Sequence, residues 1–210
     1  GTRADRKRAL EDEEMRKVFG RLPELPEVTP DLRHAQNLFI LMFLLRGLPF
    51  VDLAYLRKSD LRDNVITYRR RKTGRSLSVT LAPEAMVLLR RYMDRNESSP
   101  YLFPILSSDE GTEEAYREYQ LALRSFNQKL MLLGKLMGME GKLSSYTARH
   151  TWATTAYHCE IHPGIISEAM GHSSITVTET YLKPFHNKKI DEANKKIVDF
   201  VRRSTGWAIV

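Results

Sequence analysis

The segment "GHSSITVTETYL", residues 171–182, places Tyr181 nine positions after His172. Ile175 and Val177 alternate with threonines, which is the pattern of a short strand. A serine near the start of the segment would equally cap a short helix, because its hydroxyl accepts from a free N–H of the first turn. Both structures remain open at this point, so the role of Tyr181 depends on what the rest of the chain brings to it.

The composition is that of a globular protein with an excess of positive charge. Among 210 residues, 42% are hydrophobic and 28% are charged, and the net charge is +7. This length allows one large domain or two small ones. The positive charge fits a polyanionic partner, and it would equally serve solubility.

Cysteine content and hydropathy narrow the class of protein further. Cys159 is the single cysteine, so no internal disulfide can form and a reducing, cytoplasmic compartment is expected. The most apolar run, "LFILMFLL" at 38–45, is far shorter than the roughly 20 residues that span a bilayer. We therefore expect a buried core helix there and no membrane partner.

Apolar spacing and turn residues predict a mainly α-helical domain with a small antiparallel β-sheet. The β signal is a hairpin over Asn64–Leu81, with its turn near Thr73 and Gly74. Four helices are expected to start near 10–14, at Asp31, at Pro83 and after Gly111, and the second of them to end near Leu45. Two more helices are expected at 144–158 and 187–201, and short elements at 164–170 and 174–182.

The segment "SSYTARHTW" gathers three polar side chains at helical spacing. Arg149 and His150 follow Tyr146 by three and four positions, so all three can share one helix face. A planar guanidinium matches two oxygens of a phosphate. The alternative, which the segment alone favours, is an arginine that satisfies backbone carbonyls or a carboxylate inside the domain.

The hairpin carries the densest positive charge in the chain. "RRRKTGR" at 69–75 holds five basic residues in seven positions. Strand alternation would turn Arg69 and Arg71 to one face and Arg70 and Lys72 to the other. So dense a run favours a nucleic-acid contact over a solvated surface. The candidate DNA-binding residues are Arg69, Arg70, Arg71 and Arg75.

Together these groups are the parts of a phosphoryl transfer to tyrosine that uses no metal. Arg46 and Arg149 could stabilise charge on the phosphorus, although Arg46 is equally explained as a cation at a helix C-terminus. Lys72 could protonate the leaving oxygen. His172 could hold the phosphate while Tyr181 attacks. No clustered carboxylates suggest a metal site, and no cofactor is expected.

The order "ARHTWATT" and then "MGHSSITVTETYL" resembles the catalytic domain of tyrosine recombinases, the phage-integrase and Xer-type site-specific recombinases. The resemblance covers essentially the whole chain and implies a mostly helical domain with a small sheet. It implies that Tyr181, on a short helix, cuts DNA through a 3′-phosphotyrosyl intermediate. It also matches Arg149 to the second catalytic arginine, His172 to a phosphate-binding histidine and Lys72 to the general acid.

The chain departs from the family pattern at two positions. The usual "TGLRISEL" is here "RGLPFVDL", so Pro49 stands where the first catalytic arginine belongs, and Arg46 is the candidate replacement. Tyr146 stands where the family has a histidine. The variant "RGLPFVDLAYLRKSDL" is similar to integrases of Bacteroides-type mobile elements and to invertases.

The resemblance also implies the assembly. We expect a single catalytic domain over 1–210, with its core at 10–184 and a C-terminal helix at 185–205. The N-terminal core-binding domain of the family is not in this chain. Double-stranded DNA is the expected partner, and a homotetramer the expected synaptic complex, with the isolated chain monomeric. The C-terminal helix would dock on a neighbouring protomer or pack within its own chain.

Two rival functions remain open. A type IB topoisomerase-like enzyme would relax DNA with related chemistry, but the spacing of "GHSS…T…YL" argues against it. A recombinase-derived accessory protein would bind DNA without cutting it. The loss of the first arginine at Pro49 keeps this second alternative open.

Overall fold

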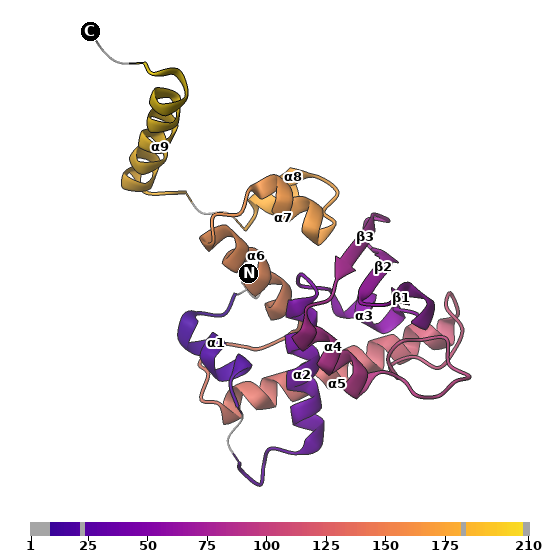
Figure 1. Cartoon of the computed structure of the whole chain (residues 1–210). Helices are drawn as coiled ribbons and strands as arrows, with labels where there is room; N and C mark the ends of the chain where they lie inside the picture. The colour runs from indigo at the N-terminus through magenta and orange to yellow at the C-terminus, as the bar shows by residue number, and fades with distance from the viewer. Residues whose placement is uncertain (1–8, 22–23, 182–183, 208–210) are drawn as a thin grey trace, which may run out of the picture.

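The computed structural model describes residues 9–21, 24–181 and 184–207 (Figure 1). Leu182, the last residue of the segment quoted first, lies outside the described residues, as do residues 1–8. The strands are β1 (Leu61–Arg62), β2 (Val65–Arg69) and β3 (Ser76–Thr80). The helices are α1 (Asp12–Phe19), α2 (Pro30–Leu44), α3 (Phe50–Tyr55), the 3-10 turn η1 (Lys58–Asp60), α4 (Pro83–Tyr92), α5 (Glu113–Leu136), α6 (Ser145–His158), α7 (Pro163–Met170), α8 (Ile175–Glu179) and α9 (Asn187–Thr205). The predicted fold class is confirmed.

Helix α2 forms the centre of the core. Thr29 caps it by accepting from the N–H of Leu32, and Pro30 occupies its first turn. Leu41 and Met42 are fully buried, as expected for the apolar run at 38–45. Because α2 packs against α4, α5 and α6, it fixes α6, which carries the candidate catalytic residues, to the rest of the domain.

The sheet places the hairpin beside this helical core. The three strands are antiparallel in the order β1-β2-β3, with Ile66 opposite Val79. Ile66, Leu77 and Val79 are buried, so the apolar face of the pleat packs inward. The two-residue strand β1 adds to the predicted hairpin, because the turn after Arg62 folds it back onto β2.

The ambiguous segment after His172 is helical. Ser174 has the extended backbone of a cap residue, and α8 begins at Ile175. The alternation of apolar and polar residues suggested a strand, but the segment forms a single helical turn. This turn buries Thr178 completely. The resemblance implied that Tyr181 lies on a short helix, but in the structure it lies just beyond the end of α8. It follows the cap residue Thr180, and its N–H donates to the carbonyl of Thr178 at 2.9 Å.

Two glycines allow segments that are distant in sequence to approach closely. Gly47 follows the end of α2 with φ +69°, and a Cβ there would lie 2.8 Å from Cα of Arg149. Gly171 ends α7 with φ +65°, and a Cβ there would lie 2.9 Å from Leu77. Both positions combine a left-handed backbone with a lack of space, so glycine is required there.

Helix α9 projects away from the rest of the described chain (Figure 1). None of its residues is buried. It begins near the end of α6, where the ring of Phe185 packs against Tyr157 and Lys189 pairs with Glu160. These contacts hold the base of the helix and leave its apolar face exposed.

Candidate active site

Arg149 is held in the interior of the site by backbone carbonyls. Its side chain is on α6 and only 5% exposed. Its Nη1 donates to Gly47 O at 3.0 Å and its Nη2 to Met170 O at 2.9 Å. Arg149 therefore does satisfy backbone carbonyls inside the domain, as the alternative interpretation stated. These bonds use two of its five N–H groups, so the other three remain for another acceptor. Burial, and then the charge of Arg70, lower the pKa of Arg149 to about 10, so it stays cationic at neutral pH.

Arg70 is a second buried guanidinium at the same place. Strand alternation predicted Arg70 and Lys72 on one face of the hairpin, but β2 ends at Arg69, so the alternation does not extend to these two residues. Arg70 is 6% exposed and donates from Nη1 to Gly171 O at 3.0 Å. Its Nε is buried and has no hydrogen-bond partner. The same Gly171 oxygen accepts from Thr73 Oγ1 at 2.9 Å.

His172 is a neutral, buried imidazole. It is 1% exposed, and its Nδ1 lies 2.7 Å from Oγ1 of Thr178 on α8. Burial lowers the pKa of His172 to about 4, and the charges of Arg149 and Arg70 act in the same direction. At neutral pH this ring therefore offers hydrogen bonds without adding positive charge.

Tyr181 lies between two imidazole rings. Its ring centre is 4.9 Å from that of His150 and 5.9 Å from that of His172, and the His172 ring is nearly parallel to it. Tyr181 also packs beside the small apolar cluster of α6 and α7 that includes Ala153. Its phenol is close enough to act electrostatically on Arg149. The tyrosine and the buried arginine that the sequence singled out are therefore neighbours.

A buried carboxylate and a half-buried phenol complete the surroundings. Asp52 Oδ1 accepts from the backbone N–H of Arg71 at 3.0 Å, while its Oδ2 is buried without a hydrogen-bond partner. Burial raises the pKa of Asp52, against the charges of Arg70 and Arg149. Burial also raises the pKa of Tyr68 on β2. Sequence reasoning missed Tyr68 and Thr178.

Three predicted catalytic residues lie at the edge of this cluster. Lys72 is exposed in the hairpin turn, and its charge contributes to the lowered pKa of His172. Arg46 has a left-handed backbone (φ 63°) and donates to Ser78 O at 3.1 Å. Tyr146 is 61% exposed, and its ring centre lies 6.4 Å from that of the buried His150. Tyr146 therefore sits at the solvent side of the α6 face that buries Arg149 and His150.

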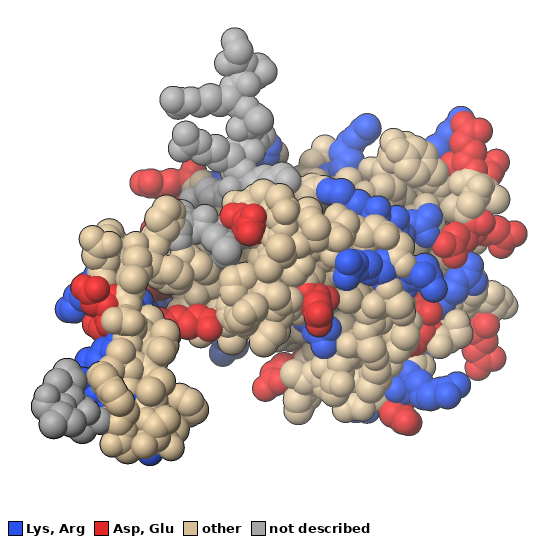
Figure 2. All heavy atoms as spheres, turned by 90° about the horizontal axis from the view of Figure 1, so that it is seen from above, with Lys and Arg blue, Asp and Glu red and all other residues tan. Residues whose placement is uncertain are grey.

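The other hairpin arginines are exposed, and each has a partner. Arg69 donates to Gly74 O and Arg75 to Ser173 O, at 2.9 and 3.1 Å. Arg71 does not present an unpaired charge, because it forms an ion pair with Glu110. Figure 2 shows Lys and Arg side chains gathered on the hairpin side of the upper face, with acidic side chains next to them at the edge.

Within residues 9–21, 24–181 and 184–207, no group of three or more His, Cys, Asp and Glu side chains is arranged to hold a metal ion. No helix in these ranges is long and apolar enough to cross a membrane.

Comparison with known proteins places this geometry in a family. A model of the phage integrase family matches residues 10–188. Tyrosine recombinase XerA of Pyrococcus furiosus is 25% identical over 179 residues, which cover 84% of this chain and 57% of that protein. Tyrosine recombinase XerC of Leptospira interrogans is 28% identical over 126 residues, which cover 60% of this chain and 38% of that protein. The chain thus spans less than two thirds of the length of these curated relatives.

Solved structures share the fold. A crystal structure of XerA recombinase matches with a TM-score of 0.59 at 19% identity, over 90% of this chain and 62% of that chain. The Tn1549 transposon integrase, in complex with a circular intermediate DNA, matches with a TM-score of 0.63 at 15% identity, over 92% of this chain and 67% of that chain. The helical arrangement around the small sheet is common to all three proteins.

Proposed function

The chain belongs to the phage integrase family, and on that premise we propose that it cuts and rejoins double-stranded DNA in site-specific recombination. One observation supports this most strongly. Arg70 and Arg149 are both buried, and within the described residues neither forms an ion pair with a carboxylate. Buried charges are normally paired. A DNA phosphate placed between them and Tyr181 would supply the missing anion.

In the proposed reaction, Tyr181 Oη attacks the phosphorus in line, and the bond from phosphorus to the 5′-oxygen breaks. The products are a 3′-phosphotyrosyl link and a free 5′-hydroxyl. His150, the imidazole nearer to Tyr181, is the candidate acceptor of the phenol proton. His172, which is neutral because of its lowered pKa, holds a phosphate oxygen through a ring nitrogen.

The charge of the missing first arginine comes from Arg70 in this proposal. Pro49 caps α3 and brings no charge. Arg46, the sequence-based candidate, uses its guanidinium on the carbonyl of Ser78 at the exposed side of β3. Arg70 is already buried beside Arg149 and has an unused Nε. We therefore expect Arg70→Ala to slow DNA cleavage far more than Arg46→Ala, in a cleavage assay with saturating DNA.

Lys72 is the proposed general acid. It extends from the hairpin turn beside the histidine that it influences electrostatically. As the bond from phosphorus to the 5′-oxygen breaks, a proton would pass from Nζ to that oxygen, so it leaves as a neutral alcohol and not as an alkoxide, which is a poor leaving group. In the reverse reaction the amine would take that proton back.

Double-stranded DNA is the proposed partner, bound over the basic upper face (Figure 2). Arg69 and Arg75 are exposed on the hairpin and would contact backbone phosphates, which fix position without reading sequence. A DNA-cutting enzyme works beside the chromosome, so we propose a cytoplasmic location. We keep 10–184 as the catalytic core and 185–205 as a separately acting helix.

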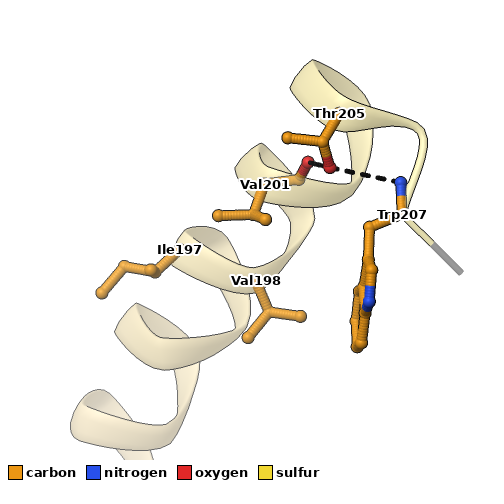
Figure 3. Close-up of a pocket in the computed structure, with 5 residues that line it drawn as sticks. All are labelled: Ile197, Val198, Val201, Thr205 and Trp207. Atoms are coloured by element: carbon orange, nitrogen blue, oxygen red, sulfur yellow. Dashed lines mark hydrogen bonds between the residues drawn. The ribbon is translucent and has the colours of Figure 1, made fainter. Parts of the chain in front are cut away.

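Helix α9 is the proposed link between protomers of a homotetramer. Its apolar side chains are exposed, among them Ile197, Phe200 and Val201. In Figure 3 the indole of Trp207 lies alongside the last turns of the helix, and the backbone N–H of Trp207 donates to Thr205 Oγ1. This face would be covered by a neighbouring catalytic domain. Phe200→Glu should leave the monomer folded and prevent assembly on DNA, as seen by sedimentation.

The experiment that tests the function is trapping on a nicked suicide substrate. The DNA flanking the gene would be tested with this chain and with the longest open reading frame that contains it. A denaturant-resistant protein–DNA band that maps to Tyr181 is expected. DNA binding without this band would favour the inactive accessory protein, and relaxation of plasmids without paired sites would favour a type IB topoisomerase-like enzyme.

A further inference from the structure

One carboxylate outside the cluster described above bridges two arginines from different segments. Glu110 lies in the loop between α4 and α5. Its Oε2 accepts from Nη2 and Nε of Arg57, at 2.8 and 3.2 Å, and its Oε1 accepts from Nη1 of Arg71 at 2.6 Å. The two arginines lower the pKa of Glu110, so this carboxylate is ionised at neutral pH.

Arg71 is fixed by three independent contacts. Besides the pair with Glu110, its guanidinium lies 3.6 Å from the ring centre of Tyr55. Its backbone N–H donates to Asp52 at 3.0 Å. The side chain and the backbone of one hairpin residue are thus tied to α3 and to the loop before α5. A residue that only contacted DNA would not require these ties.

The two neighbours of Arg71 in sequence belong to the candidate active site, Arg70 inside the cluster and Lys72 at its edge. Arg70 reaches the Gly171 carbonyl, and Lys72 acts on His172. Within the turn, Arg70 exchanges backbone hydrogen bonds with Arg75 and Gly74, at 2.8 and 2.7 Å. Those bonds close the turn, and the bonds of Arg70 and Thr73 to Gly171 O anchor it on the side of α7. The contacts of Arg71, which lies between Arg70 and Lys72, anchor it on the side of α3.

We propose that Glu110 is a positioning residue, whose carboxylate clamps Arg71 and so places Lys72 at the leaving 5′-oxygen. The inference rests on the proposed function of Lys72 as general acid. Glu110 touches neither DNA nor the reacting atoms. Its effect on the reaction passes through the hairpin turn, and a displacement of about 1 Å is enough to cost up to about a hundredfold in rate.

The test compares two DNA substrates that differ in one atom. In one, the leaving group is the natural 5′-oxygen. In the other, a sulfur replaces that bridging oxygen, and a thiolate leaves without being protonated because its pKa is far lower than that of an alcohol. Cleavage rates on both substrates would be measured, under saturating DNA, for Glu110→Gln, Lys72→Ala and Arg149→Ala. Glu113→Gln is the matched control, since the partner of Glu113 among the described residues is the exposed Arg117 on the same helix, α5.

We expect Glu110→Gln to slow cleavage of the oxygen substrate by about tenfold or more. On the sulfur substrate its rate should return to within about threefold of the unmodified protein, as for Lys72→Ala. Arg149→Ala should be slow on both substrates, and Glu113→Gln normal on both. Glu110→Asp, which keeps the charge, should recover part of the loss. Thermal melting would verify that each variant is folded.

Three results would overturn the inference. They are an unchanged rate for Glu110→Gln on the oxygen substrate, an equal loss on both substrates, and a loss of DNA affinity with no loss of rate. If Lys72→Ala itself fails to recover on the sulfur substrate, the assignment of the general acid is wrong. That result identifies a failure of the proposed function separately from a failure of the clamp.

Discussion

Acid should destabilise the protein through His172, by an amount that follows from its burial. The imidazole has a pKa of about 4 in the folded chain and an ordinary value of 6.5 when unfolded. Between these values the unfolded chain binds more protons, so the free energy of unfolding falls as the pH falls. At about 1.4 kcal/mol per pKa unit, the full effect is about 3 kcal/mol, of which about 2 kcal/mol is lost by pH 5.

Urea unfolding at pH 7.5 and pH 5.0 measures this effect, for the unmodified chain and for His172→Gln. The difference in unfolding free energy between the two proteins should shrink by about 2 kcal/mol at the lower pH. Asp52, whose raised pKa makes a contribution of opposite sign, is present in both proteins and cancels. His158→Gln, at the exposed end of α6, is the matched control for the replacement of a histidine by glutamine. A difference that stays constant between the two pH values would refute the argument from burial.

Four substitutions test other parts of the structure. Tyr181→Phe should abolish the covalent adduct and leave DNA affinity in a mobility-shift assay unchanged; a cleaving mutant would overturn the choice of nucleophile. Arg149→Ala should reduce the single-turnover cleavage rate by about a thousandfold, and near-normal turnover would contradict its role. Arg46→Ala should lower the cleavage rate less than tenfold in the same assay, because Arg46 is bound to an exposed strand carbonyl. A loss as large as that of Arg149→Ala would show that Arg46, and not Arg70, replaces the first catalytic arginine. Gly171→Ala should lower the free energy of unfolding by about 1–3 kcal/mol, because it adds a Cβ against Leu77 at positive φ; an unchanged melting temperature would show that this contact is not tight.

Local signals account for the elements that the sequence predicted well. Thr29 and Pro30 begin α2, and Ser144 begins α6, because cap residues act within four positions of their targets. The hairpin follows from its alternating strands and from Gly74. The helix α8 was ambiguous, because five residues rich in Thr and Val satisfy a strand pattern as well as one helical turn.

Contacts between distant segments account for what the sequence did not predict. The burial of Arg70 depends on Gly171, which is 101 residues away. Thr178 offers no signal of its own until α8 turns its hydroxyl to His172. Glu110 lies in a loop, where an acidic residue is ordinary, and only the folded chain brings Arg57 and Arg71 to it. Tyr181 and Arg149 could be predicted as neighbours because both match a family pattern whose residues come together in the fold.

The carbonyl of Gly171 has a consequence for how the active site is put together. It accepts from Arg70 and from Thr73, so one peptide group holds the hairpin turn and the segment leading to His172 in a common frame. Rotation of that peptide would release both donors in the same event. One backbone oxygen therefore couples the position of the hairpin turn to that of the segment that carries His172.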